Sequence, residues 1–324
     1  MEKMRFIDLF CGIGGFRQAL VEHGHTCVFS SDIDPDAQLT YAENFGEEPA
    51  GDLTDIPEDD VPAHDLLCGG FPCQPFSISG NQEGFEDARG TLLYEILRIT
   101  RLHKPNVLFL ENVKNFLGHA EGRTLETTVG LLDRLGYDVH YSVLNASRYG
   151  VAQKRERIYF VCFRKDLGIS GFKFPDPTDE DVAVEDFLLP QHDDRLQGLM
   201  IDREDLCMSS ELPMKRENRP LRIGTVGKGG QGERIYSPKG HAITLSAFGG
   251  GIGAKTGMYL VGGRIRRLHP EECRRLMGFS DGFRLHSRRN VSYKQFGNSV
   301  AVPVISKIVS SIGRFLEGKT RRAA

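Results

Sequence analysis

Over the first 165 residues, short apolar runs alternate with stretches of helical periodicity. The apolar runs predict strands at Met4–Phe10, Thr26–Ser31, Asp65–Cys68, Val107–Leu110, Val139–Asn145 and Arg157–Phe163. The periodic stretches between them predict helices, including Pro35–Phe45, Thr91–His103 and Thr124–Leu135. This alternation is typical of a parallel sheet with helices on both faces. Because ligands of such sheets bind at the carboxyl ends of the strands, we expect the chemistry just after each strand.

The pattern changes after about Gly168. From there to Pro220 the chain is rich in Pro, Asp and Glu with weak periodicity, which indicates the start of a different unit. Gly224–Gly263 is dense in glycine, with short β-like runs between KGGQGE and FGGGIGAKTG. Helical periodicity returns at Pro270–Met277 and again around Val300–Leu316.

Composition is that of a globular protein. The 324 residues are 40% hydrophobic and 26% charged, without an apolar run of membrane-spanning length. The start MEKMRFIDLF lacks the layout of a secretory signal. Seven scattered cysteines form no CxxC pair, so we expect neither a disulfide framework nor a zinc site. We therefore expect a cytoplasmic protein in a reducing compartment.

The net charge of −3 hides a strong asymmetry along the chain. Residues 215–322 hold 22 Lys and Arg against 6 Asp and Glu, whereas residues 1–214 hold 19 against 38. Such asymmetry favours a basic surface for nucleic acid, joined to a body with another task. A solvated basic face without a ligand is the plainer interpretation, and charge alone does not exclude it.

Three strand ends carry groups suited to a nucleoside. Asp8–Phe16 holds a glycine-rich turn whose G-x-G-G spacing differs from the dinucleotide fingerprint. Asp32 ends the second predicted strand, where an acid can hold ribose hydroxyls. Asp52 follows and can accept a hydrogen bond from an exocyclic amine. Each feature alone is equally typical of a tight turn or a solvated aspartate, but their order along the chain favours a nucleoside.

A second group of residues indicates covalent catalysis. Cys73 lies between prolines in the glycine-flanked segment GGFPCQPFSISG, which presents a thiol better than it buries one. Glu111 follows the apolar run Val107–Leu110. Arg155 and Arg157 begin a strand and can point to one face, although a solvated strand edge would look the same. A thiol, a carboxylate and arginines at one edge suggest attack on a polar, electron-poor ring.

In this order, these segments resemble the cytosine-C5 DNA methyltransferase family. The motifs that carry the resemblance span nearly the whole chain: FIDLFCGIGGF, GDLTDI, GFPCQPFSISG, RGTLLYEI, ENVKNF, QKRERIYF, RRLHPEECRRLMGF and YKQFGNSVAVPV. The resemblance implies an α/β fold, with a Rossmann-like doubly wound sheet that binds S-adenosylmethionine and a smaller, mostly β target-recognition domain. It places the catalytic domain at residues 1–185, completed by 290–324, and the recognition domain and hinge at 186–289.

The resemblance also implies the reaction and its residues. Cys73 would add to C6 of a cytosine flipped out of duplex DNA, Glu111 would bind N3 and the amine, and Arg157 and Arg155 would bind the base carbonyl and steady the loop. The methyl donor S-adenosylmethionine, which leaves as S-adenosylhomocysteine, would lie on Phe10, Gly12, Gly14, Asp32, Ile33, Asp52, Leu53, Pro72, Leu92, Asn298 and Ser299. No metal is expected, and the enzyme is expected to act as a monomer without a membrane. Cys11 and Asp32 stand where the family often has alanine and glutamate, changes that preserve the physical role.

A likeness to a bacterial restriction–modification member extends into the glycine-dense region. It implies a GCGC target methylated at the first cytosine, with a cognate endonuclease as functional partner. The residues expected at the DNA are Ser79, Gln231, Arg234, Thr244, Ser246, Phe248 and Gly249, Gly250 and Gly251. Ser79 and Gln231 would enter or fill the gap left by the flipped base. Phe248 stands where that relative has tyrosine.

Four other functions compete with this interpretation. An RNA cytosine methyltransferase would share the catalytic loop but would not need the glycine-dense region. A catalytically dead DNA-binding homologue would not need Cys73, Glu111, Arg157 and Asn298. A nicotinamide oxidoreductase would need a different glycine spacing, and a metalloenzyme would need partners for His23 and His25.

Overall fold

The large sheet of this computed structural model has six strands and one reversed direction. The structure describes residues 3–71, 91–168 and 170–323. The strands β1 (Arg5–Leu9), β2 (Thr26–Ser31), β3 (Leu66–Gly70), β4 (Val107–Val113), β5 (Tyr137–Asn145) and β6 (Glu156–Arg164) lie in the order β2-β1-β3-β4-β6-β5. All six predicted strands are confirmed, but the expectation of a wholly parallel sheet was wrong, because β6 runs antiparallel to both β4 and β5. The start of β6 therefore lies beside the carboxyl end of β4.

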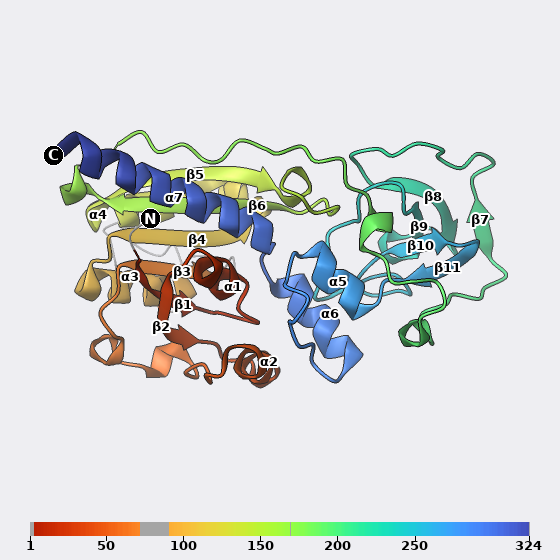
Figure 1. Cartoon of the computed structure of the whole chain (residues 1–324), viewed down its shortest axis with the longest axis horizontal. Helices are drawn as coiled ribbons and strands as arrows, with labels where there is room; N and C mark the ends of the chain where they lie inside the picture. The colour runs from red at the N-terminus through yellow and green to blue at the C-terminus, as the bar shows by residue number, and fades with distance from the viewer. Residues whose placement is uncertain (1–2, 72–90, 169, 324) are drawn as a thin grey trace.

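Helices cover both faces of this sheet, as the fold class predicted (Figure 1). Alternate strand residues point to opposite sides, and both sides are buried. On one side Phe6, Phe109 and Val161 share a core with α1 (Gly15–Glu22) and α7 (Val302–Ala323). On the other side Ile7, Leu108 and Phe160 share a core with α3 (Leu92–His103) and α4 (Arg123–Arg134). The last helix of the chain thus packs with the first.

The helix α2 (Pro35–Phe45) has the bounds that the periodicity predicted. The Asp34 carboxylate accepts hydrogen bonds from the backbone N–H groups of Asp36 and Ala37, and Pro35 occupies the first turn. Gly46 ends the helix in the left-handed conformation at φ 73°. These caps place α2 directly after β2, where the predicted nucleoside site begins.

A second, smaller sheet lies at the other end of the molecule (Figure 1). Its strands are β7 (Leu206–Met208), β8 (Leu221–Val226), β9 (Arg234–Ser237), β10 (Met258–Val261) and β11 (Arg264–Arg267), in the order β11-β10-β9-β8-β7. The helices α5 (Pro270–Leu276) and α6 (Arg289–Asn298) lead back to the large sheet. This sheet falls inside the span 186–289 expected for target recognition, whose exact bounds stay a prediction.

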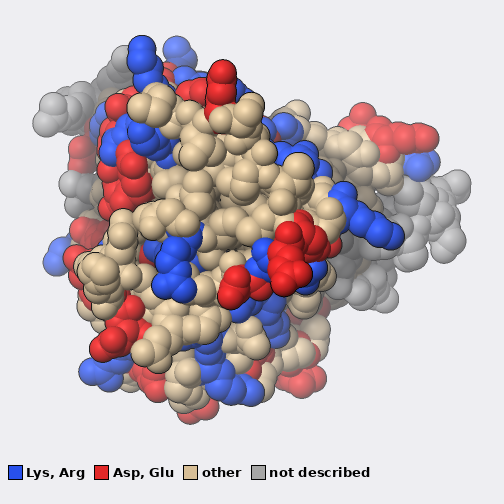
Figure 2. Space-filling model, turned by 90° about the vertical axis from the view of Figure 1, so that its right-hand side faces the viewer, with Lys and Arg blue, Asp and Glu red and all other residues tan. Residues whose placement is uncertain are grey.

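Many cations of the basic half are held in ion pairs. Arg266 and Glu272 form a fully buried pair at 2.7 Å. Further pairs involve Arg216, Arg219, Arg274, Arg275, Arg288 and Lys294. Figure 2 shows the small-sheet end with basic and acidic side chains interspersed. Part of the sequence asymmetry therefore serves internal pairing and does not add to a basic surface.

One stretch of the described chain, within Arg289–Gly318, is long and apolar enough to cross a membrane by composition alone. In the structure 61% of that apolar window is buried inside the protein. It comprises α6 and α7, and Ile305, Ile308 and Val309 of α7 are buried in the core shared with α1. This is the packing of a core helix.

Candidate active site

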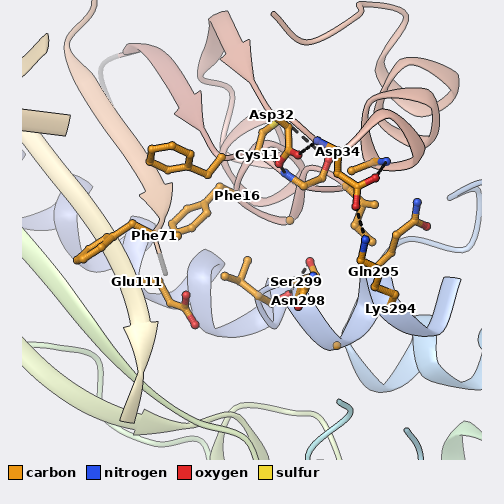
Figure 3. A pocket seen from close by; sticks show the side chains of 18 of the residues that line it. Cys11, Phe16, Asp32, Asp34, Phe71, Glu111, Lys294, Gln295, Asn298 and Ser299 are labelled. Atoms are coloured by element: carbon orange, nitrogen blue, oxygen red, sulfur yellow. Dashed lines mark hydrogen bonds and ion pairs between the residues drawn. The ribbon is translucent and has the colours of Figure 1, made fainter. Parts of the chain in front are cut away.

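A cavity of about 500 Å³ opens where the carboxyl ends of β1 and β4 meet the junction of α6 and α7. Figure 3 shows Asp32 and Asp34 at one end, Glu111 at the other, and Asn298 and Ser299 between them. The lining includes nine residues predicted from the sequence: Phe10, Gly12, Asp32, Glu111, Arg155, Arg157, Phe248, Asn298 and Ser299. Predicted cofactor, catalytic and DNA-reading residues thus share one cavity.

The cofactor end of the cavity is built on the turn after β1. Gly12 has a φ of 54°, and its backbone N–H donates a 2.7 Å hydrogen bond to the Asp32 carboxylate. A Cβ added at Gly12 would meet no described atom within 4 Å, so this side of the turn is open. The Asp34 N–H donates to the other Asp32 oxygen at 2.8 Å. Burial raises the pKa of Asp32 in spite of these two donors.

Other residues predicted for the cofactor lie outside the lining of this cavity. Gly14 caps α1 and packs against the ring of Phe45, and Leu53 is buried in the core. Ile33 is 70% exposed, and Leu92 is the first residue of α3. Asp52 accepts hydrogen bonds from the Thr54 N–H and hydroxyl, which lower the pKa of its carboxyl group. The structure assigns Gly14 and Leu53 packing roles that the motif alone did not reveal.

The helix α6 supplies cavity residues that the sequence analysis missed. Lys294 forms a 2.7 Å ion pair with Asp34, and Gln295 donates hydrogen bonds to the Asp36 carbonyl and the Thr40 hydroxyl. Burial acts to raise the pKa of Asp34, but the ion pair with Lys294 helps to lower it below its usual value. These contacts join α6 to α2. The residues lie in the motif YKQFGNSVAVPV, which was the available signal.

At the other end of the cavity Glu111 pairs with Arg157. Their closest atoms, Oε1 of Glu111 and Nε of Arg157, are 3.0 Å apart, and both side chains are largely buried. Burial raises the pKa of Glu111, while the charges of Arg157 and Arg155 act in the opposite direction. The reversed β6 explains this pairing, because Arg157 is the register partner of Val113 beside the end of β4. A carboxyl with a raised pKa is suited to donate a proton or a strong hydrogen bond.

Asn112 anchors the chain just before the predicted nucleophile. Its side-chain amide donates a 2.8 Å hydrogen bond to the carbonyl of Phe71. Pro72, Cys73 and Ser79 follow and lie outside the described residues. Asn112 therefore fixes one end of the segment that carries Cys73, a role that the sequence analysis did not assign.

Arg155 is buried and bonded to backbone carbonyls. Its guanidinium donates to the carbonyls of Leu245, Gly297 and Ser299. Burial and the neighbouring charge of Arg157 lower the pKa of Arg155 to about 9, so the group stays protonated at neutral pH. Its hydrogen bonds thus join three chain segments at the cavity wall.

The predicted DNA-reading residues gather on two glycine loops. A Cβ added at Gly232 would lie 2.4 Å from the carbonyl oxygen of Gly250, so the two loops meet backbone to backbone. Gln231 lies on the first loop, and Arg234 begins β9 directly after it. Phe248, which is 73% exposed, precedes Gly250 on the second loop and also lines the cavity. Thr244 and Ser246 donate hydrogen bonds to the carbonyls of Lys154 and Phe248.

Among the residues that the structure describes, no group of three or more His, Cys, Asp or Glu side chains is placed to hold a metal ion. The described part of the cavity offers carboxylates, amides and guanidinium groups. These suit an organic ligand.

Solved structures with this fold are methyltransferases by their titles. The Dnmt2 methyltransferase of S. pombe aligns with a TM-score of 0.72 and 19% identity over 98% of this chain and 99% of that one. The methyltransferase EhMeth of Entamoeba histolytica aligns with a TM-score of 0.73 and 18% identity over 99% of each chain. The fold is therefore the mixed-sheet α/β fold found in methyltransferases.

Sequence comparison narrows this class to one family. Residues 4–314 match the family described as C-5 cytosine-specific DNA methylase. The chain is 54% identical to the Type II methyltransferase M.HhaI of Haemophilus parahaemolyticus, over 98% of this chain and 96% of that one. It is 40% identical to M.MspI of Moraxella sp, over 97% and 71%. The protein belongs to the C-5 cytosine-specific DNA methylase family.

This membership confirms the family predicted from the motifs. It makes the protein a DNA cytosine-5 methyltransferase, an enzyme class that uses S-adenosylmethionine. The relatives of 40% identity and above, which are named Type II methyltransferases, favour this class over the RNA-directed, catalytically dead and nicotinamide-dependent alternatives.

Proposed function

We propose that this enzyme methylates the first cytosine of GCGC in duplex DNA through a covalent bond between Cys73 and C6. We further propose that it acts as a monomer in a restriction–modification system, where methylation protects host DNA from a cognate endonuclease. The relatives named Type II methyltransferases support the biological role. The resemblance in the glycine-dense region supports the target sequence.

The observation that carries the proposal is the shared cavity. The buried pair Glu111–Arg157 lies in the same cavity as Asp32 of the cofactor turn and the exposed ring of Phe248. A base stacked inside a duplex cannot reach a buried carboxyl group, so the target must be flipped out of the helix. Flipping costs roughly a few kcal/mol, which contacts in the cavity and at the DNA gap must offset.

The residues at the cofactor end fit S-adenosylmethionine. The open side of Gly12 allows close approach of a ligand, and the partly buried Asp32 carboxylate has acceptor capacity for the ribose hydroxyls. Phe10, Asn298 and Ser299 complete this end. When bound, the cofactor supplies an electrophilic methyl group.

The protein's own residues would activate cytosine in three steps. First, the Cys73 thiolate adds to C6, and the electrons of the C5–C6 double bond shift toward C5. Second, Glu111 donates a proton or hydrogen bond to N3 while Arg157 holds the carboxyl group in place. Third, after C5 has gained the methyl group, a base such as water removes the C5 proton. The C5–C6 double bond then re-forms, the C6–S bond breaks to release the Cys73 thiolate, and any proton that N3 has taken returns to Glu111.

Cys11, a described thiol that lines the cavity, is a poor rival to Cys73. Burial raises the pKa of Cys11 well above its usual value, so very little thiolate forms. Burial likewise raises the pKa of Cys68 and Cys273. Cys207 is exposed, but it lies on β7 of the small sheet.

Arg234 is the side chain best suited to read guanine. A guanidinium can donate two hydrogen bonds to O6 and N7, a contact worth roughly 1–3 kcal/mol of discrimination. The backbone contact between the two glycine loops brings Gly232, two residues before Arg234, against Gly250 and Gly251, whose backbone groups can approach base edges closely. Phe248 lacks the hydroxyl of tyrosine, so it can alter the readout at an outer base.

A covalent trap tests the mechanism. Duplex DNA with 5-fluorocytosine at the target cannot lose its C5 substituent and should retain the enzyme in a complex that survives denaturing electrophoresis. The wild-type protein and the control Cys207→Ser should give this band with S-adenosylmethionine present, whereas Cys73→Ser should not. A band that persists in Cys73→Ser would refute the assignment of the nucleophile.

A further inference from the structure

The DNA-reading side and the cofactor side of the cavity are joined by one arginine. On the first side lies the reading segment, residues 244–248. On the second lie the closing residues, 297–299. Nη1 of Arg155 donates to the Leu245 carbonyl at 3.3 Å, and Nη2 donates to the Gly297 carbonyl at 3.0 Å and to the Ser299 carbonyl. Arg155 is 2% exposed, so water competes little for these bonds.

The two segments also touch directly. A Cβ added at Gly297 would lie 2.1 Å from the backbone nitrogen of Ala247. Only glycine allows this approach, because the obstacle is backbone and cannot rotate away. A shift of the reading segment must therefore move the closing residues or open a gap at Gly297.

The closing residues are in turn tied to the cofactor turn. They end α6, whose Lys294 pairs with Asp34 and whose Gln295 bonds to Asp36 and Thr40 of α2. Asp34 follows Asp32 by two residues, and its N–H donates to the Asp32 carboxylate. A continuous set of hydrogen bonds and ion pairs, linked through α6, thus runs from Leu245 to Asp32.

We propose that Arg155 is a positioning residue that couples DNA binding at the reading segment to cofactor binding at the closing residues. The inference rests on the proposed DNA-reading role of residues 244–248. Duplex DNA bound there would hold Leu245 in place, and Arg155 would hold Asn298 and Ser299 where they close over the cofactor. By linkage, bound cofactor would strengthen DNA binding by the same factor.

Arginine suits this task because its planar fork can reach three carbonyls from one side chain. Lysine carries the same charge but a compact head on a flexible stem, so it cannot reproduce the geometry. Arg157 differs, because its guanidinium faces the Glu111 carboxylate in the cavity. The two arginines of the motif QKRERIYF thus have different partners, since Arg155 joins backbone segments and Arg157 pairs with Glu111.

The test measures the dissociation constant of S-adenosylhomocysteine by calorimetry, alone and with saturating GCGC duplex. One bound ligand typically changes the affinity for a second by about 5- to 150-fold. We expect the duplex to lower the dissociation constant of S-adenosylhomocysteine for the wild type by a factor in this range. Arg155→Met should reduce the factor to nearly one, and Arg155→Lys should retain only part of it. The matched control is Arg274→Met, because Arg274 is equally buried and also donates to backbone carbonyls, those of Phe279 and Ser280.

Thermal unfolding of each variant separates coupling from stability. We expect both methionine variants to lose stability and only the Arg155 variants to lose coupling. Full coupling in a folded Arg155→Met or Arg155→Lys protein would overturn the proposal, and so would a wild type that shows no coupling. Equal binding of GCGC and scrambled duplexes by the wild type would contradict the proposed target sequence, not the coupling. The coupling can be measured with any duplex that the protein binds, so the two failures are distinguishable.

Discussion

Asp32 and Glu111 both line the cavity, the first partly buried and the second buried, and their surroundings give them different tasks. Two backbone N–H groups donate to Asp32, which leaves acceptor capacity for hydroxyl groups of a ligand. Glu111 faces Arg157, and burial still raises the pKa of its carboxyl group. The first arrangement suits cofactor binding and the second suits proton or hydrogen-bond donation to a base.

We expect Asp32→Ala to weaken S-adenosylmethionine binding by about 1–3 kcal/mol, the scale for a lost hydrogen-bonded charge. The loss should exceed that in the control Asp65→Ala. The Asp65 carboxylate also accepts a hydrogen bond from a backbone N–H, that of Arg5 at 2.8 Å, but it lies at the amino ends of the strands. Calorimetry of both variants measures the difference. Unchanged cofactor affinity together with weaker DNA binding would show that Asp32 had been assigned the wrong ligand.

The sequence named nine of the residues that line the cavity, some from their place at the end or start of a strand and the others through the family resemblance. It could not distinguish the roles of Arg155 and Arg157, which lie two residues apart, because both were expected on one strand face, whereas Arg155 precedes β6 in the structure. Their difference depends on segments 90 and more residues away, at Leu245 and Gly297. Residues such as Lys294 stay hidden for the same reason, because the partner Asp34 lies 260 positions away.

Elements with strong periodicity were predicted well, and the others were not. The helix α2 matches its predicted bounds, and the capping groups Asp34 and Gly46 explain why. The helix α6 was not predicted, because RNVSYKQFGN has almost no apolar periodicity and is held by polar contacts. The reversal of β6 also escaped prediction, since a buried strand carries no signal of its direction.

The turn that begins α1 offers a test at this scale. Gly14 has a φ of 80°, and a Cβ there would lie 2.2 Å from the Phe45 ring. Gly14→Ala should lose more stability than the roughly 1–2 kcal/mol expected from left-handed strain alone, and it should weaken cofactor binding.

Gly46→Ala provides the matched control. Gly46 has a φ of 73°, and an added Cβ would meet no described atom within 4 Å. This variant should therefore show the strain without the clash and keep its cofactor affinity. Denaturant unfolding and calorimetry give both quantities. Equal losses in the two variants would argue against a packing role for Gly14.

For the molecule as a whole, charge pairing joins the acidic and basic halves of the chain. Lys294 and Arg288 of the basic half pair with Asp34 and Asp36 of the acidic half. These pairs bring the C-terminal segment to the cofactor turn, so one cavity draws on residues from both ends of the chain. Phe248, Glu111 and Asp32 thereby line the same cavity.

The central claim is that this cavity serves the first cytosine of GCGC. Bisulfite sequencing of plasmid DNA from cells that express the protein tests it most directly, with cells that express Cys73→Ser as the control. The account predicts methylation of the first cytosine in GCGC sites on both strands, at or near completion, and none in the control. Methylation at every CpG, or only in a motif that lacks CpG, would contradict it.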